Sequence, residues 1–167
     1  MPRAKQTTLA KQTTATKRTA AKAARLAVVV ADFHQELAQA QLNAAEDEAK
    51  RLGATILLTL RVPGCYETPL VSDHLLGRRE VDALVVLGCI ERGETLHGEV
   101  MGHVVHRALV EASLRHKKPV GLGIIGPGAN WKQAEARKEP SARAAIRAAV
   151  HSLEVLRELG RAGGPAR

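Results

Sequence analysis

The stretch VDALVVLG at residues 81–88 decides the fold class of this chain. It is a short apolar run, rich in β-branched residues, that ends in a glycine. Three more runs of this kind occur: RLAVVVA (25–31), ATILLTLRV (54–62) and KPVGLGII (118–125). Apolar strands of this continuous type are typical of a parallel sheet that is buried on both faces.

Four longer stretches with helical patterns alternate with these runs, at residues 36–53, 67–77, 98–117 and 141–160. Parallel strands need long crossover connections, which a helix supplies. The alternation therefore predicts an α/β protein, a three-layer sandwich with helices on both faces of the sheet. A chain of 167 residues is long enough for one domain with a real core.

Positive charge is concentrated at the start of the chain. Residues 1–25 contain seven basic side chains and no acidic one, which accounts for seven of the eight net positive charges. We expect residues 1–24 to form a disordered basic tail, residues 25–160 the domain and residues 161–167 a fraying end. The tail can be a solvated segment, a contact for nucleic acid or another polyanion, or a targeting sequence.

Cysteine content and hydropathy limit the cellular compartments in which the protein is expected. The two cysteines, Cys65 and Cys89, are too few for a disulfide framework and wrongly spaced for a metal motif. No apolar run approaches the roughly 20 residues that span a bilayer. These features favour a cytoplasmic protein without a membrane contact. Residues 26–167 also lack the aromatic side chains on which single-stranded nucleic acid stacks.

Four loops follow the carboxyl ends of the predicted strands, where ligands collect in open α/β sheets. They are DFH (32–34), PGCYE (63–67), CIERGETLH (89–97) and GPGANW (126–131). The carboxyl ends of parallel strands lie at one edge of the sheet. We therefore expect the four loops to converge.

The third loop carries the strongest candidate chemistry. In RGETLHGEV (92–100) a glycine precedes the start of a helix, whose free backbone N–H groups suit a phosphate. Thr95 can add a hydroxyl donor and serve as the N-cap. His97 lies within one turn of this anion site, where an imidazole can transfer protons near neutral pH. From the residues alone, a capping or surface histidine is the alternative to a catalytic acid/base.

Three other residues of these loops have both a binding and a structural interpretation. Phe33, the only phenylalanine, can stack on a planar substrate or cover one end of the sheet. Glu67 can accept hydrogen bonds from ligand hydroxyls or stand as an acid in the first turn of a helix. Cys65 fits a small buried thiol better than a nucleophile, because no base is adjacent to it in the sequence.

The sequence indicates neither a cofactor nor a metal. His103 and His106 lie three residues apart, but the apolar residues around them indicate a packing helix without further ligands. There is no G-x-x-x-x-G-K-[ST] motif, and GLGIIGPG (121–128) lacks the spacing of a dinucleotide-binding fingerprint. The candidate chemistry therefore depends on side chains acting on small-molecule substrates.

Two motifs at matching separation point to a family. VPGCYETP (62–69) is similar to the V-P-G-small-aromatic-E-x-P motif of lumazine synthases, and LGCIERGETLH (87–97) resembles their L-G-x-V/I-I-R-G-x-T-x-H motif. The resemblance also includes RLAVVVADFH, KKPVGLGII and QAEAR, and extends from about residue 25 to residue 160. It implies a four-stranded parallel sheet in flavodoxin-like order, and homo-oligomers built from pentamers that in many members form icosahedral shells.

By this resemblance, the reaction is the penultimate step of riboflavin biosynthesis. 5-Amino-6-ribitylaminouracil condenses with 3,4-dihydroxy-2-butanone 4-phosphate to 6,7-dimethyl-8-ribityllumazine, with release of phosphate and water and without a cofactor. The resemblance makes His97 the catalytic acid/base, stacks the pyrimidine on Phe33 and places the ribityl hydroxyls at Glu67. The other substrate-binding residues that it implies are Gly93, Glu94 and Thr95 at the phosphate, Leu122 and Arg137 from a neighbouring subunit, and His34, Cys65, Tyr66, Cys89, Ile90 and Glu91.

Several residues near the expected ligands depart from the family pattern. His34 replaces the usual Asn after the stacking Phe, Glu91 stands where an apolar residue packs near the ring, and Gly98 replaces an aromatic residue. The GNKG motif before the last helix is missing, so Lys138 or Arg143 would have to replace its phosphate-binding lysine. Two hypotheses follow: an active lumazine synthase, and a shell-forming or flavin- or lumazine-binding paralogue with weak or no catalysis.

Overall fold

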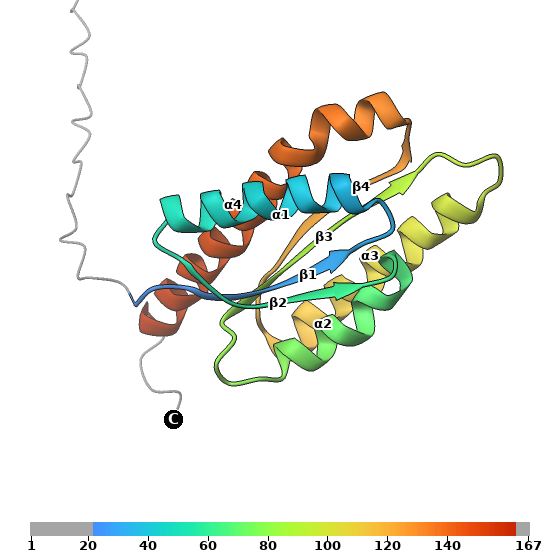
Figure 1. The fold of residues 1–167 in the computed structure, drawn as a ribbon. Coiled ribbons are helices and arrows are strands. Elements are labelled where there is room, and N and C mark those ends of the chain that lie inside the picture. Colours follow the sequence, from blue (N-terminus) through green and yellow to red (C-terminus); the bar gives the residue numbers. More distant parts are fainter. Residues whose placement is uncertain (1–21, 163–167) are drawn as a thin grey trace, which may run out of the picture.

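The computed structural model of the protein describes residues 22–162, which form one four-stranded sheet with helices on both faces (Figure 1). Residues 1–21 and 163–167, and with them most of the predicted tail and C-terminal end, lie outside the described residues. The elements in chain order are β1 (Arg25–Ala31), α1 (Gln35–Arg51), β2 (Thr55–Val62), the 3-10 helix η1 (Cys65–Glu67), α2 (Thr68–Leu76), β3 (Ala83–Glu91), α3 (His97–His116), β4 (Val120–Ala129) and α4 (Trp131–Ala162).

All four strands are parallel, and their order in the sheet is β2-β1-β3-β4. The two central strands, β1 and β3, are almost fully buried because helices cover both of their faces. Figure 1 shows α1 and α4 on one face of the sheet and α2 and α3 on the other. The predicted α/β class, the three-layer sandwich and the flavodoxin-like strand order are confirmed.

Each face of the sheet has its own core cluster. Val28 of β1 packs with Ile146 of α4 and with the alanines of α1. Its neighbour Val29 belongs to the opposite cluster, together with Leu109 of α3. Successive side chains of a strand point to opposite faces, so one continuous apolar run supplies both cores.

The last strand and the last helix are longer than predicted. β4 continues into the predicted loop at 126–131, and α4 begins at Trp131 instead of residue 141. The glycines of GPGANW and Pro140 inside the helix caused this error, because both residue types usually end regular structure. Asn130 and Gln133 start the helix, since each side chain accepts a hydrogen bond from the backbone N–H of the other. Figure 1 shows α4 changing direction along its length, as expected where a proline interrupts a helix.

Two glycines of GLGIIGPG serve the packing of α4 on β4. A Cβ atom on Gly121 would lie 2.1 Å from the carbonyl oxygen of Ala145, and one on Gly123 would lie 3.2 Å from Cβ of the same residue of α4. Side chains at either position would force α4 away from the sheet. The glycines therefore set how closely α4 approaches β4.

Ion pairs close the amino-terminal end of the sheet. Asp82 accepts hydrogen bonds from Arg25 at 2.7 Å and from Arg157 of α4 at 3.3 Å. Arg157 also donates to the carbonyl oxygen of Lys22 at 2.7 Å. Burial acts to raise the pKa of Asp82, but the hydrogen bonds and charge of Arg25 hold it below its usual value. The start of the described chain is thus fixed at the end of the sheet opposite to the predicted site loops.

Candidate active site

The four predicted loops meet at the carboxyl edge of the sheet. His34 after β1 contacts Glu91 at the end of β3 and Trp131 just after β4. Tyr66 after β2 contacts His97, which begins α3. A cleft of about 560 Å³ opens at this edge. Its walls are Glu91, Arg92, Gly93, Glu94, Thr95, Leu96, Gly98, Glu99 and Gly128.

The loop between β3 and α3 forms most of this cleft. The helix begins at His97, and its N-cap residue is Leu96, whose side chain has no polar atom that could cap it. The backbone N–H groups of Gly98 and Glu99 in the first turn are therefore available to a ligand. The prediction of Thr95 as N-cap is wrong by one residue, because the N-cap of α3 is Leu96. Thr95 Oγ1 accepts a long hydrogen bond of 3.4 Å from the His97 N–H.

His97 is exposed and lies between two residues that line the cleft. Its ring meets the ring of Tyr66 edge to face, with the centroids 5.7 Å apart. An aromatic side chain of the second loop thus orients the imidazole next to the helix N-terminus. A titratable group in this place can exchange protons with a bound phosphate ester.

Phe33 is 72% exposed, although it is the only phenylalanine of the chain. Its ring meets the ring of His34 edge to face, with the centroids 4.9 Å apart. An exposed aromatic face at a ligand-collecting edge supports the stacking interpretation over the covering one. Phe33 is not itself a wall of the cleft and reaches it through His34 and Glu91.

His34 links these aromatic side chains to the cleft. Its Nε2 atom is buried, has no hydrogen-bond partner among residues 22–162, and lies 3.6 Å from Oε1 of Glu91. Glu91 in turn is a wall of the cleft. His34 and Glu91, two of the departures from the family pattern, therefore lie beside each other.

The cleft carries more negative than positive charge. Glu91, Glu94 and Glu99 contribute three carboxylates, whereas Arg92 contributes the one guanidinium among the described walls. Glu99 lies 4.0 Å from His103, which is mostly exposed. A phosphate in this cleft would need further cations to balance these acids.

The second loop leaves the carboxylate of Glu67 accessible. Glu67 ends η1 and occupies the N-cap position of α2, yet its side chain makes no cap hydrogen bond. A Cβ atom on Gly64 would lie 3.2 Å from Oε2 of Glu67, so the glycine makes room for this carboxylate. Glu67 can therefore accept hydrogen bonds from a ligand.

Cys65, Cys89 and Ile90 have buried side chains. The Sγ atom of Cys65 lies 3.8 Å from the carbonyl oxygen of Cys89. Burial raises the pKa of the Cys65 thiol to about 12 and that of the Cys89 thiol to about 11. Both thiols are thus protonated at neutral pH, in agreement with the interpretation of Cys65 as a small buried thiol. Only the backbone of these three residues is left for the expected substrate contacts.

Leu122 and Arg137 are not among the walls of the cleft. Leu122, on the edge strand β4, packs partly buried against the core cluster beneath α2 and α3. Arg137 is exposed on α4 and donates to the carbonyl oxygen of Gln133 at 3.4 Å. A role in binding therefore requires the site of a neighbouring subunit, as the family resemblance implies. The two candidate replacements for the missing lysine, Lys138 and Arg143, form ion pairs with acids of their own chain.

The metal interpretation of His103 and His106 gains no support. The Nδ1 atom of His106 lies 2.8 Å from the carbonyl oxygen of Gly102, one turn earlier in α3. Within residues 22–162, no three His, Cys, Asp or Glu side chains are grouped so that they could hold a metal ion. None of the helices in that range is both long and apolar enough to cross a membrane.

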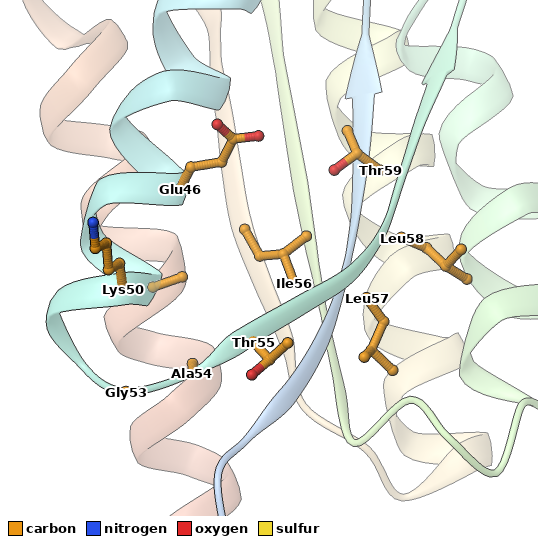
Figure 2. Close-up of a pocket in the computed structure, with 10 residues that line it drawn as sticks. Glu46, Lys50, Gly53, Ala54, Thr55, Ile56, Leu57, Leu58 and Thr59 are labelled. Carbon is orange, nitrogen blue, oxygen red and sulfur yellow. The ribbon is translucent and has the colours of Figure 1, made fainter.

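A second hollow, of about 590 Å³, lies between the end of α1 and the start of the edge strand β2. Figure 2 shows Glu46 directed from α1 toward β2, with Lys50 one turn further along the helix. The strand bulges here at Leu57, which has no partner in β1 and is 40% exposed. One acid and one amine beside apolar strand residues do not form a catalytic group, so this hollow is not a candidate active site.

Trp131 is the residue of this edge that the sequence analysis missed. It is the only tryptophan, begins α4, and has its ring centroid 5.2 Å from that of His34. The signal that could have found it is an aromatic residue directly after a strand, which is the feature that singles out Phe33.

Proteins of similar sequence identify the family. The family model for 6,7-dimethyl-8-ribityllumazine synthase matches residues 23–157. The chain is 42% identical over 142 residues to the 6,7-dimethyl-8-ribityllumazine synthase of Pyrobaculum arsenaticum. The alignment covers 83% of this chain and 95% of that protein. Enzymes of the same name from Aeropyrum pernix and Metallosphaera sedula are 41% and 39% identical; the alignments cover 81% of this chain and 92% and 89% of the relatives. The chain belongs to the 6,7-dimethyl-8-ribityllumazine synthase family.

Proposed function

We propose that this chain catalyses the reaction for which its family is named, the formation of 6,7-dimethyl-8-ribityllumazine in riboflavin biosynthesis. The two amino groups of 5-amino-6-ribitylaminouracil react with 3,4-dihydroxy-2-butanone 4-phosphate, and phosphate and water leave. The observation that carries this proposal is the position of His97: an exposed imidazole at the first residue of α3, flanked on both sides by walls of the cleft.

His97 is the general acid/base of the proposed mechanism. It takes a proton from the attacking amine and gives it to the departing hydroxyl when the amine and the ketone form a Schiff base. It then takes up a proton as the phosphate leaves, and returns a proton during ring closure. One imidazole suffices because each proton that it accepts in one step is donated in another.

The loops divide the binding of the substrates among themselves. Phe33 stacks on the pyrimidine, and Glu67 accepts hydrogen bonds from the ribityl hydroxyls. The backbone of residues 93–95 and the first turn of α3 hold the phosphate. Leu122 and Arg137 of a neighbouring subunit complete the site in this proposal.

The chain acts as a homo-oligomer of pentamers or of a multiple of pentamers, up to an icosahedral shell. Exposed apolar side chains on α3 support an assembly, because monomeric proteins rarely leave such side chains together in water. They are Val100, Val104, Val110 and Leu114. Native mass measurement should give a multiple of five chains, and a monomer at micromolar concentration would contradict the assembly.

We place this enzyme in the cytoplasm. Both cysteines are free thiols, which a reducing compartment maintains. Immunolocalisation of the native protein in its own cells checks this, and a signal confined to an oxidising compartment would contradict it.

A shell or binding protein without catalysis is the second candidate. Glu91 and Gly98 favour it, because they replace apolar and aromatic residues of the family at the cleft. They also lie close together, since a Cβ atom added to Gly98 would lie 3.0 Å from the carbonyl oxygen of Glu91. This candidate predicts tight binding of a lumazine or flavin without turnover, unchanged in His97→Ala.

The basic tail is a candidate contact for a polyanion. Its cations, repeated on every subunit of an assembly, would act multivalently. Arg157 fixes Lys22 at the end of the sheet opposite to the cleft, so removal of residues 1–21 should leave catalysis unchanged. We expect salt-sensitive retention of the full chain on immobilised heparin. Retention that persists after this deletion would refute a role of the tail.

The direct test of the proposed function mixes the purified chain with both substrates and follows the absorbance of the lumazine. We expect turnover without added metal or cofactor. No turnover at high enzyme concentration, with a relative of the same family active in the same assay, would contradict the proposal.

A further inference from the structure

The charge of the cleft conflicts with the binding of a phosphate ester. Three carboxylates stand among its described walls, against one guanidinium. Like charges within about 10 Å repel at ordinary ionic strength. All three acids are exposed, so water and salt screen them in part, and 44% of the Glu91 side chain is exposed. Glu91 ends a buried strand and is the acid of the cleft that is closest to the sheet.

Glu91 is also the acid of the cleft that has a partly buried histidine side chain, that of His34, beside it. The imidazole of His34 is enclosed by the rings of Phe33 and Trp131, and its side chain is 20% exposed. Its buried Nε2 atom lies 3.6 Å from Oε1 of Glu91 and has no hydrogen-bond partner among the described residues. This distance is too long for a hydrogen bond but short for the attraction of opposite charges.

We propose that His34 is a positioning residue that acts through Glu91: the protonated imidazole neutralises this carboxylate and thereby sets the affinity of the cleft for the phosphate of the substrate. The inference rests on the proposed function for the identity of the anion. It goes beyond the proposed function by assigning a role to His34 and Glu91, two of the residues that depart from the family pattern. His34 itself touches neither the phosphate nor the reacting atoms.

The other charged groups of the surrounding elements are already paired or lie in solvent. Asp32, which precedes Phe33, is paired with Arg61 of β2. On α4, Glu135 is paired with Lys138 at 2.6 Å. The other charged groups within two residues of His34, Glu91 or Trp131 in the chain are Glu36 on α1, Arg92 after β3 and Lys132 on α4, all exposed. Glu91 is therefore the carboxylate whose charge a protonated His34 would balance.

The only tryptophan reports the state of His34. The ring centroids of Trp131 and His34 are 5.2 Å apart, and a protonated imidazole at such a distance quenches indole fluorescence. We expect the emission of the assembled protein to rise as the pH increases from 5 to 8. The rise should be absent in His34→Asn, which keeps a polar side chain of similar reach.

Binding of inorganic sulfate tests the effect on the anion. Sulfate keeps two negative charges between pH 6 and pH 8, whereas phosphate changes charge in this range. At pH 8, Glu91→Gln should bind sulfate about two- to fivefold more tightly than the unaltered chain. At pH 6, His34→Asn should bind it about two- to fivefold more weakly. Glu111→Gln, an exposed α3 acid paired with Arg107, is the matched control and should change nothing.

The double variant decides whether His34 acts through Glu91. In the Glu91→Gln background, His34→Asn should have no further effect on sulfate, because no carboxylate remains to be neutralised. Steady-state kinetics should show the same pattern in KM for the phosphate-bearing substrate, measured separately from kcat and from the KM for the pyrimidine. Circular dichroism and native mass confirm that each variant folds and assembles.

Three results would overturn the inference. One is an equal loss of sulfate affinity from His34→Asn in both backgrounds, which would mean that His34 acts on the anion directly. Another is emission from Trp131 that does not depend on pH. The third is no sulfate binding by the folded chain at pH 6. These readouts need no turnover, so a chain that binds sulfate as expected but makes no lumazine contradicts the proposed function alone.

Discussion

The two ends of the parallel sheet use charge in opposite ways. At the amino-terminal end, Asp82 is enclosed by Arg25 and Arg157, and each charge has a partner. At the carboxyl end, acids outnumber basic residues around a cleft, and Phe33 and Leu96 are both 72% exposed. At the amino-terminal end, these charged side chains are paired within the chain. At the carboxyl end, charged and apolar side chains remain exposed to a ligand or a neighbouring subunit.

This difference separates stability from function. Closed ion pairs and buried strands fix the chain at the amino-terminal end, where they have no access to a substrate. Loops at the carboxyl ends of the strands sit on that rigid base and carry the exposed chemistry. Substitutions at one end should therefore change the free energy of unfolding, and substitutions at the other should change catalysis.

The largest effect is expected from His97→Ala. Loss of a general acid/base usually lowers the rate by 10²–10⁴-fold, and we expect kcat to fall by at least about 10²-fold without a change in stability. Lumazine absorbance measures kcat, and urea unfolding measures the stability. The matched control is His103→Ala, an exposed histidine on the same helix, which should keep most of the activity. Equal losses in both variants would break the comparison at the carboxyl end.

The next effect is expected from Asp82→Ala at the opposite end. This substitution leaves two partly buried guanidinium groups without their carboxylate, and should lower the free energy of unfolding by about 2 kcal/mol. Asp47→Ala removes an exposed acid that is paired with Arg143 and should cost less than about 0.5 kcal/mol. Both enzymes should retain their kcat. A large loss of kcat in folded Asp82→Ala would show that the two ends are coupled.

Glu48 should make stability depend on pH. Hydrogen bonds from Arg51 and Arg147 to this buried carboxylate lower its pKa from the usual 4.5 to about 2. The ionised form is favoured in the folded state, so its contribution is complete above about pH 5 and is lost as the pH falls toward 2. Urea unfolding at pH 6 and at pH 3 should show a smaller difference in Glu48→Gln than in the unaltered chain. In Glu46→Gln, an exposed acid on the same helix, the difference should persist.

The smallest effect is expected at the cysteines beneath the site. With pKa values of about 12 and 11, Cys65 and Cys89 are protonated and buried at neutral pH. A thiol reagent should therefore modify the native protein only slowly at pH 7 and leave the rate of lumazine formation unchanged. Rapid loss of activity on modification of Cys65, prevented by substrate, would assign this thiol to the site after all.

Much of the fold could be predicted because each strand is visible in the sequence as a short, continuous apolar run. Runs such as VDALVVLG are too apolar for an exposed segment, although β3 continues past Gly88 to Glu91. The start of α4 could not be predicted in this way. Pro140 and the glycines before Trp131 are signals for the end of a helix, and the side-chain bonds between Asn130 and Gln133 that start α4 are a local detail.

The site could be predicted as a set of loops but not as a set of contacts. The positions of Phe33 and His97 after strands place them at one edge of the sheet, whatever the packing. The contact of His34 with Trp131 depends on where α4 begins, and that of His34 with Glu91 depends on side-chain direction. The burial of Ile90 likewise follows from its packing in one cluster with Val105 and Leu109 of α3, which the motif itself does not encode.

The central claim is that the loops at the carboxyl ends of the strands build one site for the lumazine. The most direct measurement is a crystal structure of the full chain with bound 6,7-dimethyl-8-ribityllumazine. We predict its ring system stacked on Phe33, with His97 within reach directly or through one water, and a neighbouring subunit beside it. A ligand bound in the hollow between α1 and β2, or a ring out of contact with Phe33, would contradict the account.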